Sequence, residues 1–363
     1  MKGSSIAAPA LLRSAPILVT GGAGFIGCNL ADRLAAEGNE VLVFDSLARP
    51  GVAANLAWLK RRHPRLVGTM IADIRDEAAV RAAVARATAV FHLAAQVAVT
   101  TSMTDPRADF DVNVLGTMLL LDAMRRRGER TPLIFASTNK VYGDLSEVAL
   151  ADDGERYLPR DPDLRAHGIG EVQPISFHTP YGCSKGAADQ YVLDFARSFG
   201  LPTSVLRMSC IYGRRQRGTE DQGWVAHFLL RALAGEPVTI YGDGRQVRDI
   251  LFVDDAVAAY LAAWRQIGAV SGRAFNLGGG PRNAVSLLQL LRCIEHTTGT
   301  SVDVRYADWR PGDQRYFVSD TRLLSRTLDL APPLSWRDGV ATLAACFQQE
   351  RREPSRRVAG AAD

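Results

Sequence analysis

The stretch Thr20-Gly21-Gly22-Ala23-Gly24-Phe25-Ile26-Gly27 decides the fold that this sequence predicts. It follows a short β-branched run at 17–20 and opens a helical stretch. Gly21 permits a tight turn, Gly24 lets the backbone approach a pyrophosphate, and Gly27 allows the helix to pack closely on the sheet. The N-terminus of the helix offers unpaired N–H groups and the positive end of a dipole to phosphates. Strand, glycine turn and helix in this order predict a dinucleotide-binding unit.

The residue that closes the second predicted strand indicates which dinucleotide binds. That strand spans 40–44, and Asp45 follows it. A carboxylate at this point can accept hydrogen bonds from the 2′-OH of an adenosine ribose and would repel a 2′-phosphate. Asp45 therefore favours NAD over NADP.

The alternation of strands and helices continues along the chain and sets the fold class. The predicted strands lie at 17–20, 40–44, 65–72, 89–93, 133–136 and 204–207, and the predicted helices at 25–37, 77–87 and 109–127. Strands separated by helices of this length form right-handed βαβ units. We therefore expect an α/β fold: a doubly wound parallel sheet of the Rossmann type, with helices on both faces. After about Met208 the alternation loosens, which predicts a smaller C-terminal α/β lobe that binds the substrate.

The predicted domain boundaries follow these changes of pattern. We predict a flexible leader at 1–15 and a dinucleotide-binding domain at 16–207, to which a later segment at about 246–275 also belongs. The substrate lobe is predicted at 208–245 and 276–349, and a flexible tail at 350–363. The stretch 144–179 is polar and carries three prolines, so we expect an irregular excursion over the surface. A loop of that size in a compact domain is usually functional or disordered.

Composition limits the functions that the chain can have. With 363 residues, 47% hydrophobic and 23% charged, it has the profile of a soluble globular protein. No apolar run approaches the roughly 20 residues of a membrane span, so we expect no membrane contact. The net charge of +4 comes from dispersed arginines, which argues against nucleic acid as a partner. Five widely spaced cysteines argue against a disulfide framework or a metal site and indicate a cytoplasmic protein.

A tyrosine and a lysine are the best candidates for proton transfer. Tyr181 and Lys185 are four residues apart, on one face of a helix that follows Pro180. A nearby ammonium favours phenolate and brings the phenol pKa, ordinarily about 10, closer to neutrality. Such a phenolate can take a proton from a sugar hydroxyl while a hydride leaves for NAD⁺. Only four of the 43 basic residues are lysines, so a lysine at this spacing indicates a need for a compact ammonium.

Other strand ends supply further candidates around the dinucleotide. Ser137 and Thr138 end the fifth predicted strand, where we expect both hydroxyls to face the reacting centre. Asp73-Ile74 after the third strand could hold the adenine, and Leu93-Ala94-Ala95 after the fourth could lie along the cofactor; either could instead be ordinary strand-end chemistry. The predicted cofactor-binding residues are Gly21, Gly24, Phe25, Ile26, Gly27, Asp45, Asp73, Ile74, Leu93, Ala94, Ala95, Ser137, Tyr181 and Lys185.

Taken together, these motifs resemble the extended short-chain dehydrogenase/reductase superfamily of NAD-dependent nucleotide-sugar epimerases and dehydratases. The resemblance covers about 17–347, nearly the whole chain. More narrowly, the stretches 94–102, 137–144, 181–194, 221–224 and 244–249 resemble the family of CDP-paratose 2-epimerases, also called CDP-tyvelose epimerases. The resemblance implies an isomerase of carbohydrate biosynthesis with a nucleotide-diphosphate sugar as substrate and a homo-oligomeric state, dimer or tetramer.

The resemblance also assigns roles to individual residues. Thr138 matches the family's catalytic hydroxyl, Tyr181 its base and Lys185 its cofactor-binding lysine. Around the substrate the matching or expected positions are Gln96, Thr100, His178, Gln222, Arg248, Arg310 and Asp313. The implied reaction oxidises C2 of the sugar to a 2-keto intermediate, which turns over in the site and is reduced from the opposite face.

Some positions depart from the family pattern or leave alternatives open. Asn139-Lys140 stands where a 4,6-dehydratase carries an acid and a base, so the sequence argues against that reaction. Met208, Cys210 and a basic segment after Gly213 differ from the 2-epimerase pattern and leave the nucleotide and sugar open. A C4-epimerase of a UDP-sugar or other nucleotide sugar would use the same Thr138, Tyr181 and Lys185. A dinucleotide-sensing regulatory protein without turnover is an alternative of another class.

Overall fold

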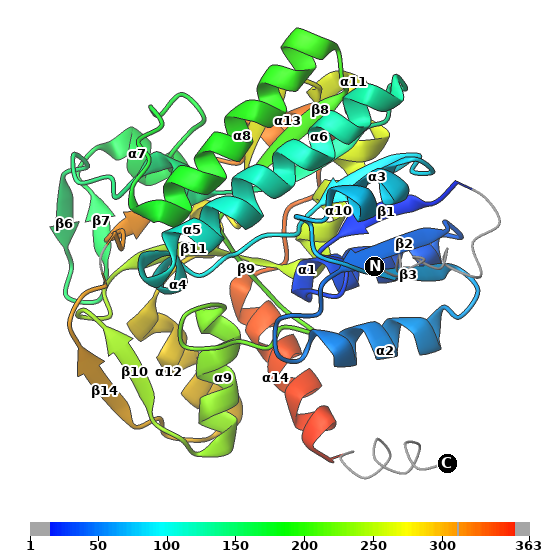
Figure 1. The fold of residues 1–363 in the computed structure, drawn as a ribbon. Helices are drawn as coiled ribbons and strands as arrows, with labels where there is room; N and C mark the ends of the chain where they lie inside the picture. The colour runs from blue at the N-terminus through cyan, green and yellow to red at the C-terminus, as the bar shows by residue number, and fades with distance from the viewer. Residues whose placement is uncertain (1–14, 311, 353–363) are drawn as a thin grey trace.

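A parallel sheet of seven strands forms the centre of the larger lobe (Figure 1). The structure is a computed structural model that describes residues 15–310 and 312–352, so the predicted leader, apart from Ala15, and residues 353–363 lie outside it. The sheet order is β12-β8-β5-β4-β1-β2-β3. The strands are β1 (Ile17–Thr20), β2 (Val41–Asp45), β3 (Val67–Ile71), β4 (Ala89–His92), β5 (Leu133–Thr138), β8 (Thr203–Met208) and β12 (Arg273–Leu277). The predicted α/β class with a doubly wound parallel sheet is confirmed.

The point where the strand order reverses places the site. β1 pairs with β2 on one side and with β4 on the other, with Thr20 opposite both Phe44 and His92. In doubly wound sheets, ligands bind beyond the carboxyl ends of the strands at such a reversal. The glycine turn that follows Thr20 lies at that point.

Helices cover both faces of the sheet, and side-chain alternation divides the core between them. Ile17 and Val19 pack in one buried cluster, and Leu18 packs in another on the opposite face. Because successive strand residues point to opposite faces, a strand covered on both sides is apolar throughout. The helices of this lobe are α1 (Phe25–Ala36), α2 (Val52–Arg62), α3 (Glu77–Val84), α4 (Val99–Thr104), α5 (Pro106–Phe110), α6 (Gly116–Arg127), α8 (Thr179–Phe199), α10 (Val253–Arg265) and α11 (Ile267–Val270).

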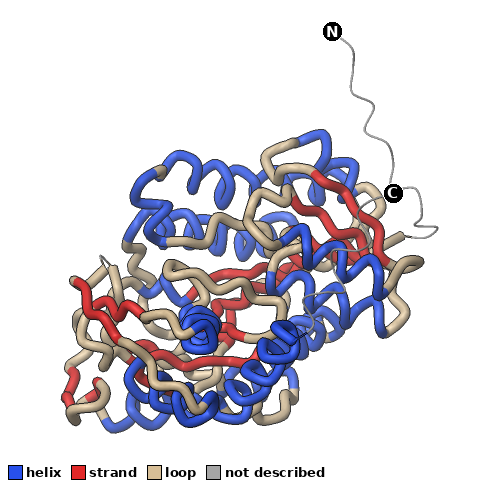
Figure 2. Tube along the Cα trace, turned by 90° about the horizontal axis from the view of Figure 1, so that it is seen from below, coloured by secondary structure: helices blue, strands red, loops and turns tan. Residues whose placement is uncertain are grey.

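The smaller lobe has its own strands and helices, and Figure 2 shows its strands as a group apart from the main sheet. Its strands are β9 (Cys210–Tyr212), β10 (Val238–Tyr241), β11 (Val247–Phe252), β13 (Ala284–Ser286), β14 (Val304–Ala307) and β15 (Tyr316–Phe317). Its helices are α9 (Trp224–Ala234), α12 (Leu287–Thr298), α14 (Trp336–Arg352) and the 3-10 turn η3 (Pro281–Asn283). α13 (Arg322–Leu328) packs instead against α10, α11 and β12 of the larger lobe. β11 pairs with β9, β13 and β15, so the strand at 247–252 belongs to this lobe and β12 belongs to the main sheet.

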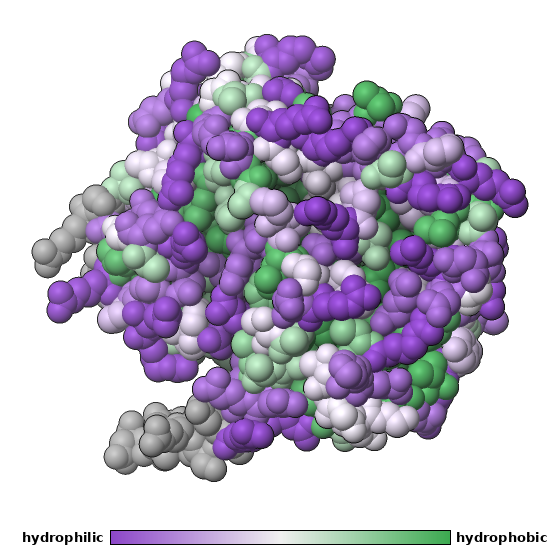
Figure 3. Space-filling model, turned by 180° about the vertical axis from the view of Figure 1, so that it is seen from behind, coloured by the Kyte–Doolittle hydropathy of each residue, from purple (hydrophilic) through white to green (hydrophobic). Residues whose placement is uncertain are grey.

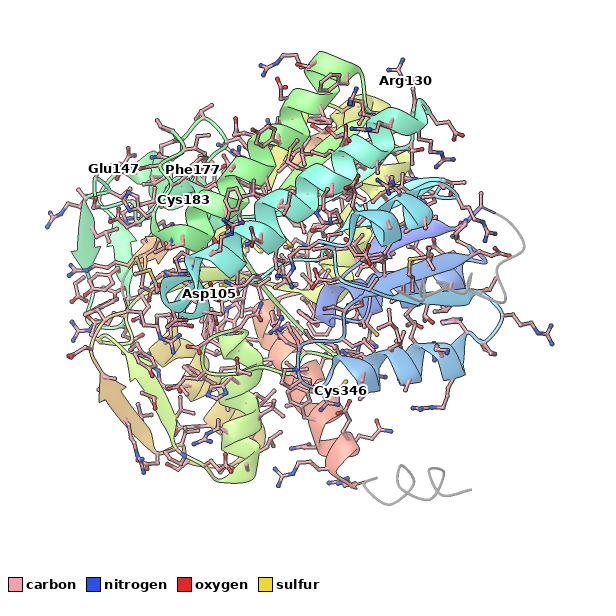
Figure 4. All side chains as sticks on the ribbon, viewed as in Figure 1. Asp105, Arg130, Glu147, Phe177, Cys183 and Cys346 are labelled. Carbon is pink, nitrogen blue, oxygen red and sulfur yellow. The ribbon has the colours of Figure 1, made fainter. Side chains whose placement is uncertain are left out.

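The excursion predicted at 144–179 is more ordered than the sequence indicates. It contains an antiparallel pair, β6 (Leu150–Asp152) and β7 (Tyr157–Pro159), and the short helix α7 (Pro162–His167). The prediction of a wholly irregular segment was therefore wrong, because strands of three residues leave almost no periodic pattern. Phe177 and Cys183, labelled in Figure 4, lie where the excursion returns to the start of α8.

Three other boundaries differ from the sequence prediction. Residues 350–352, predicted to belong to a flexible tail, are helical, since α14 continues to Arg352. The single helix predicted at 109–127 is divided by a π-helical turn, η1 (Asp111–Leu115). α2, which carries three basic residues in its last turn, is a helix that the sequence pattern did not predict.

Candidate functional site

A cavity of about 760 Å³ lies at the carboxyl ends of the central strands. Its volume is in the range of small-molecule and cofactor sites. All the predicted catalytic and cofactor-binding residues line it, and so do Gln96 and Gln222 from the predicted substrate set. Thr100, His178, Arg248, Arg310 and Asp313 are not among the lining residues.

The glycine turn has the close backbone packing that a bound pyrophosphate requires. Gly21 has φ +67°, and its N–H donates to the Phe44 carbonyl at 2.8 Å. A Cβ at Gly27 would lie 2.2 Å from the Gly21 carbonyl oxygen, so only glycine fits there. α1 begins after Gly24 without a side-chain cap. The first N–H groups of the helix are thus left to a ligand, and the residues present fit an NAD pyrophosphate.

The Asp45 carboxylate is held rigidly at the end of β2. Its Oδ2 accepts from the Ala23 N–H at 3.0 Å and its Oδ1 from the Leu47 N–H at 2.9 Å. Each carboxylate oxygen can accept a second hydrogen bond. Asp45 therefore fits a ribose hydroxyl as its ligand.

Asp73 occupies a different environment on the rim. Its carboxylate binds Arg75 through two side-chain hydrogen bonds, at 2.9 and 2.8 Å, and those bonds lower its pKa. Ile74 next to it is buried, so the two residues contribute a charged edge and an apolar wall.

Tyr181 and Lys185 lie on the first turns of α8, and both are buried. Burial raises the pKa of Tyr181 to about 12, with a hydrogen bond to Thr138 acting to lower it and the charge of Asp109 to raise it. Burial lowers the pKa of Lys185 to about 7, opposed by the charges of Asp189 and Asp109. Lys185 Nζ donates to the Ala136 carbonyl at 2.7 Å. Among the groups that act on the pKa of Tyr181, Thr138 favours the phenolate.

The two hydroxyls at the end of β5 have different surroundings. Thr138 Oγ1 accepts from the Lys140 N–H at 3.3 Å and caps η2 (Asn139–Tyr142). Ser137 Oγ donates to Asp189 Oδ2 at 2.7 Å, and Asp189 is also held by two hydrogen bonds from Arg207. The Ser137 hydroxyl thus belongs to a buried ionic network, which corrects the expectation that it faces the reacting centre.

Asp109 is a buried carboxylate whose charge acts on Tyr181 and Lys185, and the sequence did not predict it as a site residue. Asp109 accepts hydrogen bonds from Ser184 Oγ, from Gln96 Nε2 at 2.8 Å and from Asn113 Nδ2 at 3.2 Å. Burial raises its pKa, and its charge acts on Tyr181 and Lys185. It comes from α5, beside η1, and π-helical turns are frequent at functional sites. The sequence contains no local signal for this turn.

The predicted substrate residues are only partly brought together. Arg248 Nη2 donates to Asp313 Oδ1 at 2.6 Å, whereas Arg310 pairs with Asp221 at 3.2 Å. Gln222 accepts a hydrogen bond from Arg49, on the cofactor side of the cavity.

Two further predicted substrate residues, His178 and Thr100, differ in their exposure to solvent. His178 is exposed and lies 3.4 Å from Asp144 of the excursion, so the structure does not bring it to the cavity wall. Thr100 Oγ1 is buried without a hydrogen-bond partner among the described residues.

Within the described ranges, no three His, Cys, Asp or Glu side chains gather in a way that could hold a metal ion. No helix in the same ranges combines the length and apolar character that crossing a membrane requires.

Known proteins share this chain's sequence and fold over nearly their full length. A CDP-paratose 2-epimerase from Salmonella typhi is 41% identical over 336 residues, which cover 89% of this chain and 96% of that protein. A UDP-glucose 4-epimerase from Thermotoga maritima, solved with UDP-glucose, superposes with a TM-score of 0.80 at 32% identity and covers 93% of this chain and 99% of its own. A UDP-glucose 4-epimerase from Thermus thermophilus, solved with NAD, has a TM-score of 0.76 at 32% identity, covering 92% and 99%.

A family model agrees with these likenesses and with the geometry of the cavity. The model of the NAD dependent epimerase/dehydratase family matches residues 17–278, from β1 to just beyond β12. The chain therefore belongs to the NAD dependent epimerase/dehydratase family, with NAD as its cofactor.

Proposed function

We propose that this protein is an NAD-dependent nucleotide-sugar epimerase that inverts C2 of a CDP-sugar through a transient 2-keto sugar. The observation that carries the proposal is the buried Tyr181, which lines the same cavity as Thr138, Lys185 and the glycine turn. The 41% identity to a CDP-paratose 2-epimerase supports C2 as the reacting carbon and CDP as the nucleotide.

Each proposed role follows from the position of a side chain. NAD⁺, when bound, accepts a hydride from the sugar carbon and gives it back. Tyr181 takes the proton of the sugar hydroxyl and later returns it, and Thr138 acts to lower the pKa of the phenol. Lys185 carries its charge from α8 to the end of β5, and Asp45 is placed for the ribose 2′-OH. The protein supplies orientation and charge placement, while the hydride chemistry belongs to the nicotinamide.

The smaller lobe is the proposed site of the nucleotide. We assign 16–207, joined by about 253–275, to NAD binding. We assign 208–252 and 276–349 to the nucleotide sugar, because β11 pairs with strands of the smaller lobe and not with the main sheet as the sequence predicted. Arg248 and Arg310 remain the proposed diphosphate ligands, since a guanidinium fork suits phosphate oxygens. Both are paired with carboxylates here, so substrate binding has to compete with Asp313 and Asp221.

Inversion at C4 of a UDP-sugar is a second candidate. The likeness to the UDP-glucose 4-epimerase of Thermotoga maritima favours it, because that fold covers 93% of this chain. The same Thr138 and Tyr181 would serve either carbon, so the substrate decides between the two reactions. A sensing protein without turnover would have no use for the buried Tyr181 at this place.

The deciding experiment offers the purified protein a panel of CDP-, UDP-, GDP- and dTDP-sugars in heavy water and follows epimers by NMR. We expect inversion at C2 of the CDP-sugar, with no solvent deuterium on carbon, because hydride transfer preserves the original C–H hydrogen. Tyr181→Phe should abolish turnover yet keep NAD and nucleotide-sugar binding. Deuterium at the inverted carbon, or full turnover by Tyr181→Phe, would contradict the mechanism. Inversion at C4 would select the second candidate.

We also propose that the protein forms a homo-oligomer. Phe110, Leu115, Tyr191 and Phe199 are each at least 40% exposed and come from α5, η1 and α8. α6 and α8 run side by side across the front of Figure 1, and α8 also contacts α5 and η1, so these residues come from neighbouring helices. Exposed aromatic residues are enriched at interfaces. The opposite side of the molecule is mostly hydrophilic, with hydrophobic residues in small separate areas (Figure 3).

We also place the protein in the cytoplasm. All five cysteines are free thiols, as suits a reducing compartment.

A further inference from the structure

Lys140 lies in the cavity wall close to the proposed proton-transfer group. It is in η2, the 3-10 turn that follows β5, and its backbone N–H binds the Thr138 hydroxyl. Its side chain is 20% exposed and lines the same cavity as Thr138 and Tyr181. The nucleotide-sugar end of the cavity therefore contains a cation that the proposed function leaves without a role.

The partners of Lys140 leave part of its hydrogen-bonding capacity unused. Nζ donates to the Gly312 carbonyl at 3.3 Å. The nearest carboxylate, Asp313, is 3.7 Å away and binds Arg248 more closely, at 2.6 Å. An ammonium has three N–H donors, so with Gly312 and Asp313 as partners one remains for a ligand.

The charges around Lys140 favour a ligand with electron-rich oxygens. Asp313 stands between Lys140 and Arg248, so one carboxylate faces two cations and one positive charge remains. Burial lowers the pKa of Lys140, the charge of Asp313 opposes that change, and the charge of Arg248 adds to it. An oxygen with free lone pairs at this point would stabilise the ammonium.

We propose that Lys140 is a specificity-determining residue that donates hydrogen bonds to an oxygen of the sugar, either a hydroxyl or the transient carbonyl. The inference rests on the proposed function and deepens it. The sugar is favoured over the diphosphate because the Lys140 N–H binds the Thr138 hydroxyl at 3.3 Å, and both residues line the same cavity as Tyr181. A carboxylate at this position can act as acid or base, whereas an ammonium that stays protonated only donates. A lysine in place of a carboxylate at position 140 therefore suits a site that binds the sugar and does not catalyse the loss of water from it.

The test compares three variants of the NAD-containing enzyme. Lys140→Met removes the ammonium, Lys140→Arg keeps the charge but replaces a compact donor with a planar fork, and Lys60→Met is the matched control on the exposed side of α2. The readouts are NAD content, the dissociation constant of CDP alone, and kcat/KM with the nucleotide sugar that wild type turns over.

A sugar contact predicts a distinctive set of results. Lys140→Met should lose roughly 10- to 100-fold in kcat/KM, the range of a lost charged hydrogen bond, while CDP affinity and NAD content stay within about twofold. Lys140→Arg should recover only part of the loss, and Lys60→Met should equal wild type.

Two results would overturn the inference. One is Lys140→Met within threefold of wild-type kcat/KM. The other is an equal loss of CDP affinity, which would move Lys140 to the diphosphate. The proposed function is judged separately, by which sugar wild type inverts and at which carbon.

Discussion

Burial controls the charge of the residues at the reacting end of the cavity. It raises the pKa of Tyr181 to about 12 and lowers that of Lys185 to about 7, so it favours the neutral form of each. A positive charge bound beside them would favour phenolate and disfavour the ammonium. The proton-transfer pair is thus tuned by what binds in the cavity as well as by its own spacing.

Buried His92 is expected to make the stability of the folded protein depend on pH. It is buried at the end of β4, 2.7 Å from Thr20 Oγ1 and 3.0 Å from Thr117 Oγ1. Burial lowers its pKa from 6.5 to about 3, with the charge of Lys185 adding to the effect. Between these values the unfolded chain binds more protons, so His92 makes the folded state less stable as pH falls from 6.5 towards 3.

The His92 prediction is tested by urea unfolding between pH 7 and pH 5. His92→Gln should lower the free energy of unfolding at pH 7, because two buried hydrogen bonds change, but its stability should fall less with acid than that of wild type. Parallel pH dependences of the two proteins would contradict the buried neutral imidazole.

The turn between β1 and α1 is the element on which cofactor binding depends. The Cβ of Gly27→Ala would meet the Gly21 carbonyl oxygen, which is backbone and cannot move aside cheaply. We expect a loss of about 1–3 kcal/mol in stability, as for overpacking, together with loss of bound NAD.

The matched control for Gly27→Ala is Gly268→Ala in α11. A Cβ at Gly268 would meet nothing within 4 Å, so this variant should keep its NAD and change stability by no more than about 1 kcal/mol. Thermal unfolding and the ratio of NAD to protein measure both effects. Equal behaviour of the two variants would show that the close packing of the turn does not matter.

The exposed residues of α5, η1 and α8 lead to a prediction about the oligomeric state of the protein. If they form the subunit interface, Tyr191→Glu should shift the protein towards the monomer in light scattering at micromolar concentration, because a buried unpaired charge is costly. Val172→Glu is the control, since Val172 is 96% exposed on the excursion, outside those helices. A monomeric wild type, or an unchanged mass of Tyr191→Glu, would contradict the interface.

The sequence by itself determined the fold class, the cofactor, and the catalytic and cofactor-binding candidates that line the cavity. These depend on local chemistry: a glycine turn between strand and helix, a carboxylate at a strand end, and a tyrosine one helical turn from a lysine. Parallel topology then fixes where such strand ends meet, because the carboxyl ends of parallel strands share one edge.

Only the tertiary structure decided which side chains are engaged elsewhere. The Ser137 hydroxyl donates a hydrogen bond to Asp189, 52 residues away in the sequence, and Gln222 accepts one from Arg49, 173 residues away. Asp109 reaches Ser184 from a helix interrupted by a π-turn. Partners so far apart in sequence leave no periodic signal, since their contact depends on how the helices pack on the finished sheet.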